Sequence, residues 1–487
     1  MLKRLFFFVA AISLFSASFD QLQAATIRIA YRSKGREMEL LRKAIDEWLK
    51  KYNGEHAVEI VTLPHASNEC YALYQQWFGA GSFDVDILQA DIAWMSALSN
   101  YWEPLDEYCK DISFSDYFDV ILENMKDDKG GIIALPVYVD CGVMYYRKDL
   151  LEKYGKEVPK TLEDLYETAL YIQNEERKDE AKKNRFYGLV YQAKAFEILT
   201  CNFCELIDAC GGAVVKDGKV EINSPRGMYA AEFFVKCIKN IMSHSVLNYS
   251  EEDARGMFQS GNAVFMRSWP YAYALMNDPS TAVSGKVGVM TIPPSATGGK
   301  ESGILGGWLV AVSKYSKHKA LAADLAKFIA SKEQQKHRVE FSYLPTFKSL
   351  YSDPDVLKTK PFIVSLREPL LKAVARPTKV FGKNYSKASS EIFNTINTIL
   401  ADSLEDNTEN FKPNRLMNRL NTKLENLLLS SGTADRLPAS DRDKAGEVGV
   451  FANILNSISA FFSRCVEFFR TSNEVSKSAE DKKAAES

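Results

Sequence analysis

The sequence predicts an α/β protein, because strand-like apolar runs alternate with amphipathic helical runs along most of its length. Residues 26–30 alternate as a strand does, and residues 37–52 follow with a helical repeat. Residues 58–62, 70–78 and 86–90 continue the pattern as strand, helix and strand. This order is typical of a parallel sheet covered by helices.

A second α/β series begins after residue 140. The run Thr161-Leu-Glu-Asp164 predicts the capped start of a helix. The strands expected here are residues 186–190, 263–266, 286–290 and 309–313, and the helices are residues 228–241, 254–259 and 319–330. Two such series predict two α/β lobes.

The first 24 residues have the features of a secretory signal peptide. Lys3 and Arg4 give a positive start, residues 5–15 are apolar, and Leu22-Gln-Ala24 offers a small-residue cleavage site. No cysteine follows the apolar core before Cys70, so no lipid-attachment site is expected near the new N-terminus. In a bacterium with two membranes, the mature chain would be periplasmic.

Composition excludes several classes of function. The 487 residues carry 61 Lys+Arg and 63 Asp+Glu, a balance that gives no electrostatic reason to expect a nucleic-acid partner. The five histidines are scattered, so we expect neither a metal site nor a cofactor. An aromatic content of 12% is enough to furnish a site for a flat-faced ligand.

Eight cysteines in an exported chain raise the question of disulfides. Cys201 and Cys204 form a Cys-x-x-Cys pattern, but they lie in the apolar helical stretch 198–209. Cysteine buried as a small hydrophobic residue is therefore favoured over a metal or redox role. The pairing of the other cysteines stays open.

The segment 134–149 predicts either an ordinary strand with a turn or a chain crossing at a functional cleft. Its apolar run is interrupted by Tyr138 and Asp140, and an unpaired carboxylate is costly inside a buried strand. A chain that crosses between two lobes could instead present both groups to a ligand. Asp91, Asp140 and Trp269 are expected at or just beyond strand ends, where open α/β sheets bind ligands. Trp308 is expected at a strand start beside two glycines. Taken singly, each of these four residues could be structural, and a tryptophan more often belongs to the core than to a ligand site.

Several short motifs together resemble a known family. The matching stretches are residues 90–94, 102–106, 134–153, 261–272, 285–288, 306–308 and 375–377. In order and spacing, over about residues 26–430, they resemble the extracellular solute-binding receptors of ATP-driven (ABC) sugar importers. Among these the chain looks most similar to the trehalose/maltose-binding proteins.

The resemblance implies a periplasmic-binding-protein-like fold, with two α/β lobes joined by crossing hinge strands. The expected division is a signal peptide at 1–24, lobe 1 at 25–140 with 305–345, lobe 2 at 141–304 with 346–430, and a tail at 431–487. In that tail, residues 448–469 have helical apolar spacing, which predicts an amphipathic helix. Residues beyond 471 are charged and expected to be disordered.

The resemblance also implies a function. The chain would capture a disaccharide or oligosaccharide by lobe closure and deliver it, as a monomer, to an inner-membrane ABC permease. The family's ligand contacts fall here on Glu37, Asp91, Tyr138, Asp140, Trp269, Tyr271, Trp308 and Arg376. Carboxylates and arginine suit a polyhydroxylated ligand, and aromatic rings cover its apolar faces.

This sequence departs from the family at two positions near the expected site. An arginine that the family places in the second helix region is Cys70 or Tyr71 here, and Cys141 stands where a small residue is usual. Copying the family's ligand directly is therefore not justified.

Two other functions are weighed against a transport receptor. Asp91 and Asp140 could be the carboxylate pair of a glycoside hydrolase, but the sequence marks neither as a proton donor and holds no nucleophile motif. The tail segment keeps open a sensor that reports ligand to a signalling receptor. We expect a binding protein, not an enzyme.

Overall fold

The computed structural model describes residues 24–431, except residues 34, 128 and 407–410. The predicted signal peptide, apart from Ala24, and the predicted tail helix at 448–469 lie outside the described residues. Within the described ranges, no helix is long and apolar enough to cross a membrane.

The described chain forms two larger sheets, one in each lobe, and a short hairpin. The first sheet has the order β2-β1-β3-β11-β4, with β1 (Thr26–Arg32), β2 (Ala57–Leu63), β3 (Ile87–Asp91), β4 (Leu135–Cys141) and β11 (Leu305–Val312). The second has the order β10-β5-β9-β6, with β5 (Val143–Arg147), β6 (Tyr187–Val190), β9 (Ala263–Ser268) and β10 (Val287–Met290). The hairpin joins β7 (Val215–Lys216) and β8 (Lys219–Val220).

Helices cover both sheets, as the alternating pattern predicts. Those packed on or near the first sheet are α2 (Glu37–Lys50), α3 (Ser67–Gly79), α4 (Asp119–Leu122), α11 (Lys319–Ala330) and α12 (Lys332–Val339). Those around the second sheet are α5 (Lys148–Lys153), α6 (Leu162–Glu176), α7 (Glu197–Ala209), α8 (Pro225–Asn240), α9 (Glu251–Gln259) and α10 (Ala272–Met276). The predicted cap of α6 is present, since Thr161 Oγ1 accepts a hydrogen bond from the Asp164 amide at 3.0 Å.

The sheets are mixed, which corrects the expectation of parallel sheets. Strands β1, β2 and β3 are parallel, but β11 runs antiparallel to both β3 and β4. In the second sheet, β5 is antiparallel to β9 and β10, whereas β6 and β9 are parallel. The antiparallel direction of β11 has a physical reason. The chain returns from the second lobe and enters the first sheet at the end where β3 and β4 finish, so β11 runs opposite to both. Strand β11 therefore begins at Leu305, before the expected start.

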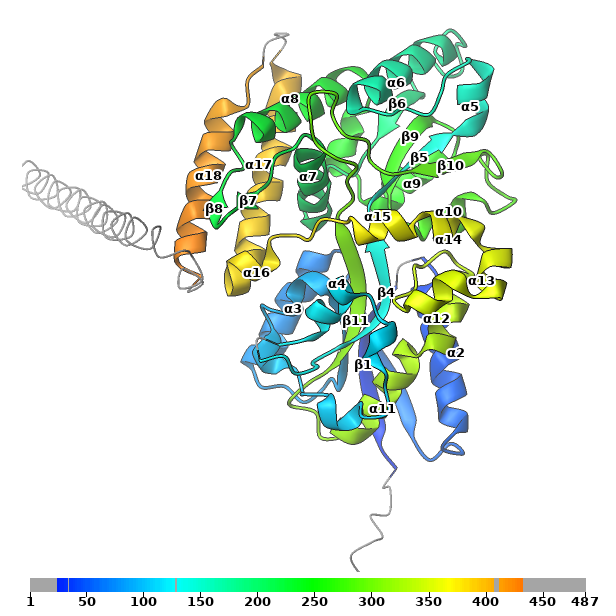
Figure 1. Cartoon of the computed structure of the whole chain (residues 1–487), viewed down its shortest axis with the longest axis vertical. Helices are drawn as coiled ribbons and strands as arrows, with labels where there is room; N and C mark the ends of the chain where they lie inside the picture. The colour runs from blue at the N-terminus through cyan, green and yellow to red at the C-terminus, as the bar shows by residue number, and fades with distance from the viewer. Residues whose placement is uncertain (1–23, 34, 128, 407–410, 432–487) are drawn as a thin grey trace, which may run out of the picture.

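In the part of the chain that the structure describes, the backbone passes between the lobes three times. Strand β4 leads into β5 through Gly142, β11 returns, and the segment at Val374 crosses again. Figure 1 shows β4 and β11 running from the lower, first lobe into the middle of the molecule. The Val374 amide and carbonyl hydrogen-bond to Gly303 and Leu305, each at 2.8 Å. The crossings therefore lie side by side.

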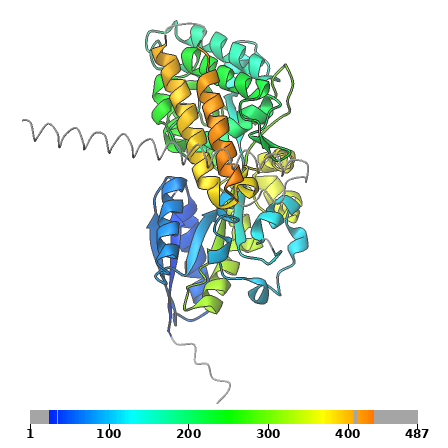
Figure 2. The same cartoon turned by 90° about the vertical axis from the view of Figure 1, so that its left-hand side faces the viewer.

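The last described helices pack on the second lobe. Short helices α13 (Pro354–Thr359), α14 (Pro361–Ser365), α15 (Arg367–Leu371) and α16 (Thr378–Phe381) precede α17 (Tyr385–Glu405) and α18 (Asn414–Leu429). Helix α17 contacts α7, α8 and α18. Figure 2 shows α17 and α18 side by side along that lobe.

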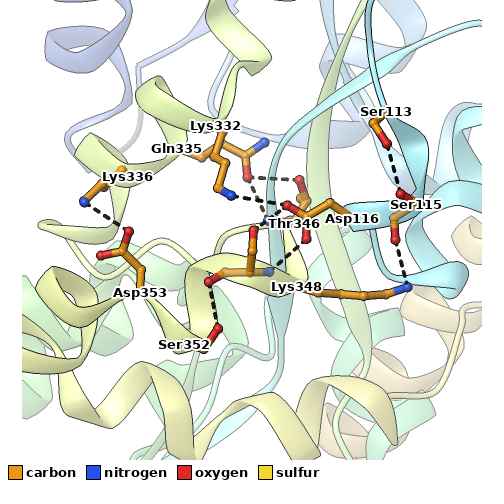
Figure 3. Close-up of polar contacts among 11 residues, drawn as sticks. Ser113, Ser115, Asp116, Lys332, Gln335, Lys336, Thr346, Lys348, Ser352 and Asp353 are labelled. Carbon is orange, nitrogen blue, oxygen red and sulfur yellow. Dashed lines mark hydrogen bonds and ion pairs between the residues drawn. The ribbon is translucent and has the colours of Figure 1, made fainter.

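Residues 346–353 contact the first lobe, although the predicted division gives them to the second. Figure 3 shows this polar network, in which Asp116 lies near Lys332. The Ser349 amide donates to Asp116 Oδ1 at 2.9 Å, and Thr346 donates to Gln335 Oε1 from both its amide and its hydroxyl. The Lys336 ammonium lies 3.1 Å from an oxygen of Asp353. This stretch lies against α12, and the exact residue bounds of the lobes remain a prediction.

Candidate functional site

Strand register brings four of the predicted residues to the end of the first sheet that faces the second lobe. Trp308 on β11 is paired with Asp91 on β3 and with Tyr138 on β4. Asp140 is paired with Gly306 two positions along. Three adjacent strands thus place two carboxylates and two aromatic rings at one place, as the strand-end argument predicts for Asp91 and Asp140.

A cavity lies between the two lobes at this place. Seven of the eight predicted residues line it: Glu37, Asp91, Asp140, Trp269, Tyr271, Trp308 and Arg376. Tyr138 does not line it. We call this cavity the inner chamber. Its volume is about 50 Å³, which is room for only a few water molecules in this closed arrangement.

Arg376 joins acidic side chains of both lobes. Its Nη2 donates to Asp91 Oδ1 at 2.5 Å, and its Nη1 donates to Glu197 Oε1 at 2.9 Å. Asp91 ends β3 of the first lobe, whereas Glu197 begins α7 of the second. Burial by itself would lower the pKa of the Arg376 guanidinium, but the charge of Asp91 above all keeps that pKa well above its ordinary value. The side chain is therefore a permanent cation between two carboxylates.

Glu197 is itself held in place by the second lobe. Its Oε1 accepts a hydrogen bond from the Tyr385 hydroxyl at 2.5 Å, and its Oε2 accepts one from Ser389 Oγ at 2.6 Å. Both donors lie on α17. The carboxylate that orients Arg376 is thus fixed from three directions.

Glu37, at the start of α2, forms a second polar cluster. Its Oε1 accepts a hydrogen bond from the Tyr138 hydroxyl at 2.6 Å, and its Oε2 accepts one from Gln89 Nε2 at 2.8 Å. Burial above all raises the pKa of Tyr138 well above its ordinary value, so this hydroxyl stays a proton donor. Tyr138 therefore donates to Glu37 and helps to orient it, and the ligand contact that the family resemblance implies for Tyr138 stays a prediction.

Each of the two tryptophans has a buried arginine against its ring. The Arg32 guanidinium lies 4.0 Å from the centroid of Trp308, and that of Arg267 lies 4.0 Å from the centroid of Trp269. Such cation–π contacts hold the rings in place. Trp269 follows β9 of the second lobe, and Trp308 lies in the first, so the chamber has one stacking ring from each side.

Glycine at position 306 makes room for the Trp269 ring. A Cβ on Gly306 would lie 3.0 Å from Trp269 Cζ3 and 3.2 Å from Asp140 Cβ. The next residue, Gly307, has a φ of +139°, which side chains rarely adopt. The two glycines before Trp308 therefore allow the ring of one lobe to approach the strand of the other.

Tyr271 lies where the two lobes touch. Its hydroxyl donates to Glu252 at 2.6 Å, and its ring stacks on Tyr343 with centroids 6.1 Å apart. A Cβ on Gly35 would lie 3.2 Å from Tyr271 Cδ2, so the first-lobe backbone is close to this ring. Tyr271 is buried, and the described conformation is closed around it.

A larger cavity adjoins the inner chamber and shares His65, Phe196 and Glu251 with it. We call it the outer chamber. Its volume is about 490 Å³. Asn68 and Glu69 line it from the first lobe, and Lys194 lines it from the second. Within the described ranges, Asn68 Oδ1 is buried without a hydrogen-bond partner, so it is an acceptor that a ligand could use.

Sequence reasoning missed several residues of the inner chamber. Arg32 ends β1, so the strand-end argument applied to Asp91 would have found it. Glu197 begins the helix that follows β6. The strand-end argument points to it less directly, because a loop separates it from the end of the strand. His65, Ser67, Phe196, Ile198, Cys201 and Glu251 also line the chamber.

The cysteines near the site are buried thiols. All seven cysteines in the described ranges are unpaired and buried. Cys70 Sγ donates to the Pro64 carbonyl at 3.2 Å, and Tyr71 packs against Trp94, so neither supplies the family's arginine. Burial raises the pKa of Cys141 far above its ordinary value, so this thiol stays protonated. In the same ranges, no group of three or more His, Cys, Asp or Glu residues could hold a metal ion.

Comparison with known proteins places this geometry in context. Residues 33–336 match the family model described as bacterial extracellular solute-binding protein. A probable ABC transporter-binding protein of Deinococcus radiodurans is 38% identical over 388 residues, which cover 79% of this chain and 91% of the relative.

Solved structures also resemble this chain. The maltose-bound MalE3 of T. maritima is 33% identical, with a TM-score of 0.76 over 83% of this chain and all of that one. A solute-binding protein of Thermotoga lettingae, solved with α-D-tagatose, is 23% identical with a TM-score of 0.71 over 83% of this chain and all of that one. This second likeness concerns the fold alone.

Proposed function

Because the chain belongs to the bacterial extracellular solute-binding proteins, we propose that it is the receptor of an ATP-driven sugar importer. Its solute is a disaccharide or a longer oligosaccharide of the maltose or trehalose type. The relative from D. radiodurans carries an ABC transporter-binding name, and the MalE3 structure was solved with maltose. The first likeness favours an ABC importer, and the second favours a sugar as its solute.

The observation that carries the proposal is that Trp269 of the second lobe and Trp308 of the first both line a chamber that carboxylates also line. Aromatic rings suit the apolar faces of pyranose rings, and carboxylates accept hydrogen bonds from sugar hydroxyls. Each lobe contributes at least one tryptophan and at least one carboxylate to the chamber. We assign ligand contacts to Glu37, Asp91, Asp140, Trp269, Tyr271, Trp308 and Arg376, and a positioning role to Tyr138.

Binding proceeds by lobe opening and closure. The inner chamber of about 50 Å³ is too small for a sugar, so the lobes must separate for one to enter and cannot close as far around it as they do here. A ligand that touches both lobes binds the closed state better than the open one, and this difference drives closure. The Asp91–Arg376–Glu197 link must rearrange during this cycle, because it joins both lobes in the closed state.

The outer chamber gives room for a ligand longer than a disaccharide. Its volume of about 490 Å³ lies within the range of small-molecule sites. A disaccharide would occupy the inner chamber, and further units of a longer chain would extend past Phe196 toward Lys194 and Asn68. We therefore include longer glucans among the candidate ligands.

We further propose that the mature protein is periplasmic, acts as a monomer without nucleic acid, and delivers its ligand to an inner-membrane permease. The proposal includes that the protein releases its sugar unchanged, without hydrolysing it. A glycoside hydrolase is disfavoured, because Asp91 accepts hydrogen bonds from Arg376 and from the Ala93 amide and is thus engaged as an acceptor. A sensor for a signalling receptor is the remaining alternative, and a neighbouring permease gene would argue against it.

Isothermal titration of the mature protein against trehalose, maltose, sucrose, longer glucans and monosaccharides tests the proposal. We expect a dissociation constant of about 1 μM or tighter for at least one sugar, about −8 kcal/mol, and no hydrolysis of that sugar. Absence of binding across the panel would contradict the sugar assignment, and sugar turnover would contradict the receptor assignment.

A further inference from the structure

A fully buried ion pair lies beside the chain crossings and has no direct place in the chamber. Arg267 on β9 and Glu205 on α7 both have side chains with 0% exposure. Arg267 Nε donates to Glu205 Oε2 at 2.8 Å, and its Nη2 donates to Glu205 Oε1. Burial by itself would lower the pKa of Arg267, but the charge and hydrogen bonds of Glu205 raise it. Apolar residues often replace such pairs without loss of stability, so stability alone is a weak reason for this one.

The Glu205 carboxylate contacts two of the three crossings between the lobes. Its Oε1 accepts a hydrogen bond from the Ile304 amide at 3.0 Å, directly before β11. Gly142, between β4 and β5, is so close that a Cβ there would lie 1.6 Å from Glu205 Oε1 and 2.5 Å from Arg267 Nη2. The Gly142 amide also donates to the Ile304 carbonyl at 3.2 Å. The pair therefore holds both crossings against the second lobe.

The other end of the pair lies against a ring that lines the chamber. The Arg267 guanidinium lies 4.0 Å from the centroid of Trp269, whose ring lines the chamber. Trp269 in turn lies against Gly306 of β11. A continuous set of contacts thus runs from the stacking ring through Arg267 and Glu205 to the crossing strands.

We propose that Glu205 and Arg267 are a positioning pair that fixes the second-lobe end of the hinge and couples stacking on Trp269 to lobe closure. This inference rests on the proposed function, because it assigns the pair to the binding cycle of that same site. Bending is then confined to the first-lobe side of Gly142 and Ile304, the two residues that the pair contacts. Neither member of the pair contacts the ligand.

The test uses the full mature chain and separates positioning from stability. The double variant Glu205→Leu with Arg267→Met replaces the pair by apolar side chains of similar length, and Glu205→Gln removes only the charge. We expect the double variant to keep a melting temperature close to that of the wild type. We also expect both variants to bind the sugar selected by the titration panel at least ten-fold more weakly.

A second readout needs no ligand. Hydrogen–deuterium exchange of the Gly142 and Ile304 amides should be faster in both variants than in the wild type. The matched control is Glu176→Gln, which removes a buried carboxylate of the second lobe that pairs with Lys153 and Lys182. It should leave sugar affinity within two-fold and hinge exchange unchanged.

Each failure has a distinct meaning. Wild-type affinity in a folded Glu205→Gln or double variant overturns the positioning role. Unchanged exchange of both hinge amides overturns the contact between the pair and the crossings. A wild-type protein that binds no sugar overturns the ligand assignment instead, and the exchange experiment still decides whether the pair holds the hinge. If one variant does not fold, the other is sufficient for both readouts.

Discussion

Arg376 Nη2 lies 2.5 Å from Asp91 Oδ1, and this bond ties the third chain crossing to the end of a first-lobe strand. Two residues expected to bind the ligand thus bind each other in the closed structure. Glu197 accepts a second bond from the same guanidinium and belongs to the other lobe. The closed state therefore has a polar link of its own, with which a ligand must compete or combine.

Replacement of Arg376 by lysine should weaken sugar binding. Lysine keeps the charge but lacks the planar fork that reaches both carboxylates. Breaking a buried charge pair at a binding site costs about 2–5 kcal/mol, so we expect at least about 2 kcal/mol of lost binding energy by titration. The control is Lys412→Met, which removes an exposed ion pair with Glu232 and should leave affinity unchanged. Tighter binding by Arg376→Lys would mean that the link opposes the ligand.

Replacement of Trp269 by alanine should remove one stacking face of the chamber. Aromatic residues that dominate binding cost about 2 kcal/mol or more on truncation, and we expect that loss in the titration. Trp77, whose ring stacks on Tyr74 with centroids 5.8 Å apart and does not line the chamber, supplies the matched control. Trp77→Ala should lower the melting temperature without changing affinity. Equal affinities of Trp269→Ala and the wild type would assign Trp269 to packing.

Ligand length should depend on the outer chamber. The variants Asn68→Ala and Lys194→Ala remove an acceptor and a donor from its two sides. Each should weaken binding of a longer glucan about five-fold or more, since a hydrogen bond contributes about 1 kcal/mol, while binding of the disaccharide stays unchanged. Titrations with maltose and a four-unit glucan make the comparison. Equal effects on both ligands would contradict an extended binding mode.

Acid stability should depend on Glu176. Burial alone would raise the pKa of this carboxyl, but hydrogen bonds from Lys153, Lys182 and Tyr154 lower it from about 4.5 to about 2. A carboxyl whose pKa is lower in the folded state stabilises the fold above its unfolded pKa, and this contribution is lost as the pH falls from about 4.5 to 2. It is at most about 3 kcal/mol, because both lysines are partly exposed.

The measurement is urea unfolding at several pH values between 2 and 7. Wild type should lose stability below pH 4.5 more steeply than Glu176→Gln, which has no such carboxyl to titrate. Parallel curves for the two proteins would exclude this carboxyl as the cause of acid destabilisation.

Local patterns determined most of the secondary structure. The helix expected at residues 319–330 has those bounds in the structure, because its apolar face repeats cleanly. The cap at Thr161 is equally local. The direction of β11 was not predictable in this way, since nothing within residues 305–312 indicates which neighbours the strand will meet.

The residues of the candidate site also differ in whether local patterns predict them. Asp91, Asp140 and Trp269 could be singled out as residues at strand ends, and Arg376, Glu37 and Tyr271 only through the family resemblance. Tyr138 was expected to contact the ligand; here it donates a hydrogen bond to Glu37, and its contact with a ligand stays a prediction. This hydrogen bond joins β4 to α2, which lie about a hundred residues apart in the sequence, so no local pattern predicts it.

The sequence by itself determined the α/β class, the order of the elements and the residue types suited to a polyhydroxylated solute, because these depend on periodicity, capping and side-chain chemistry. Only the tertiary structure decided the partners: Glu197 for Arg376, Arg32 and Arg267 for the two tryptophans, and Glu205 for the crossing strands. Charges and rings pair across distances that the chain spans only after folding. Those pairings decide which side chains face the chamber and which hold others in place.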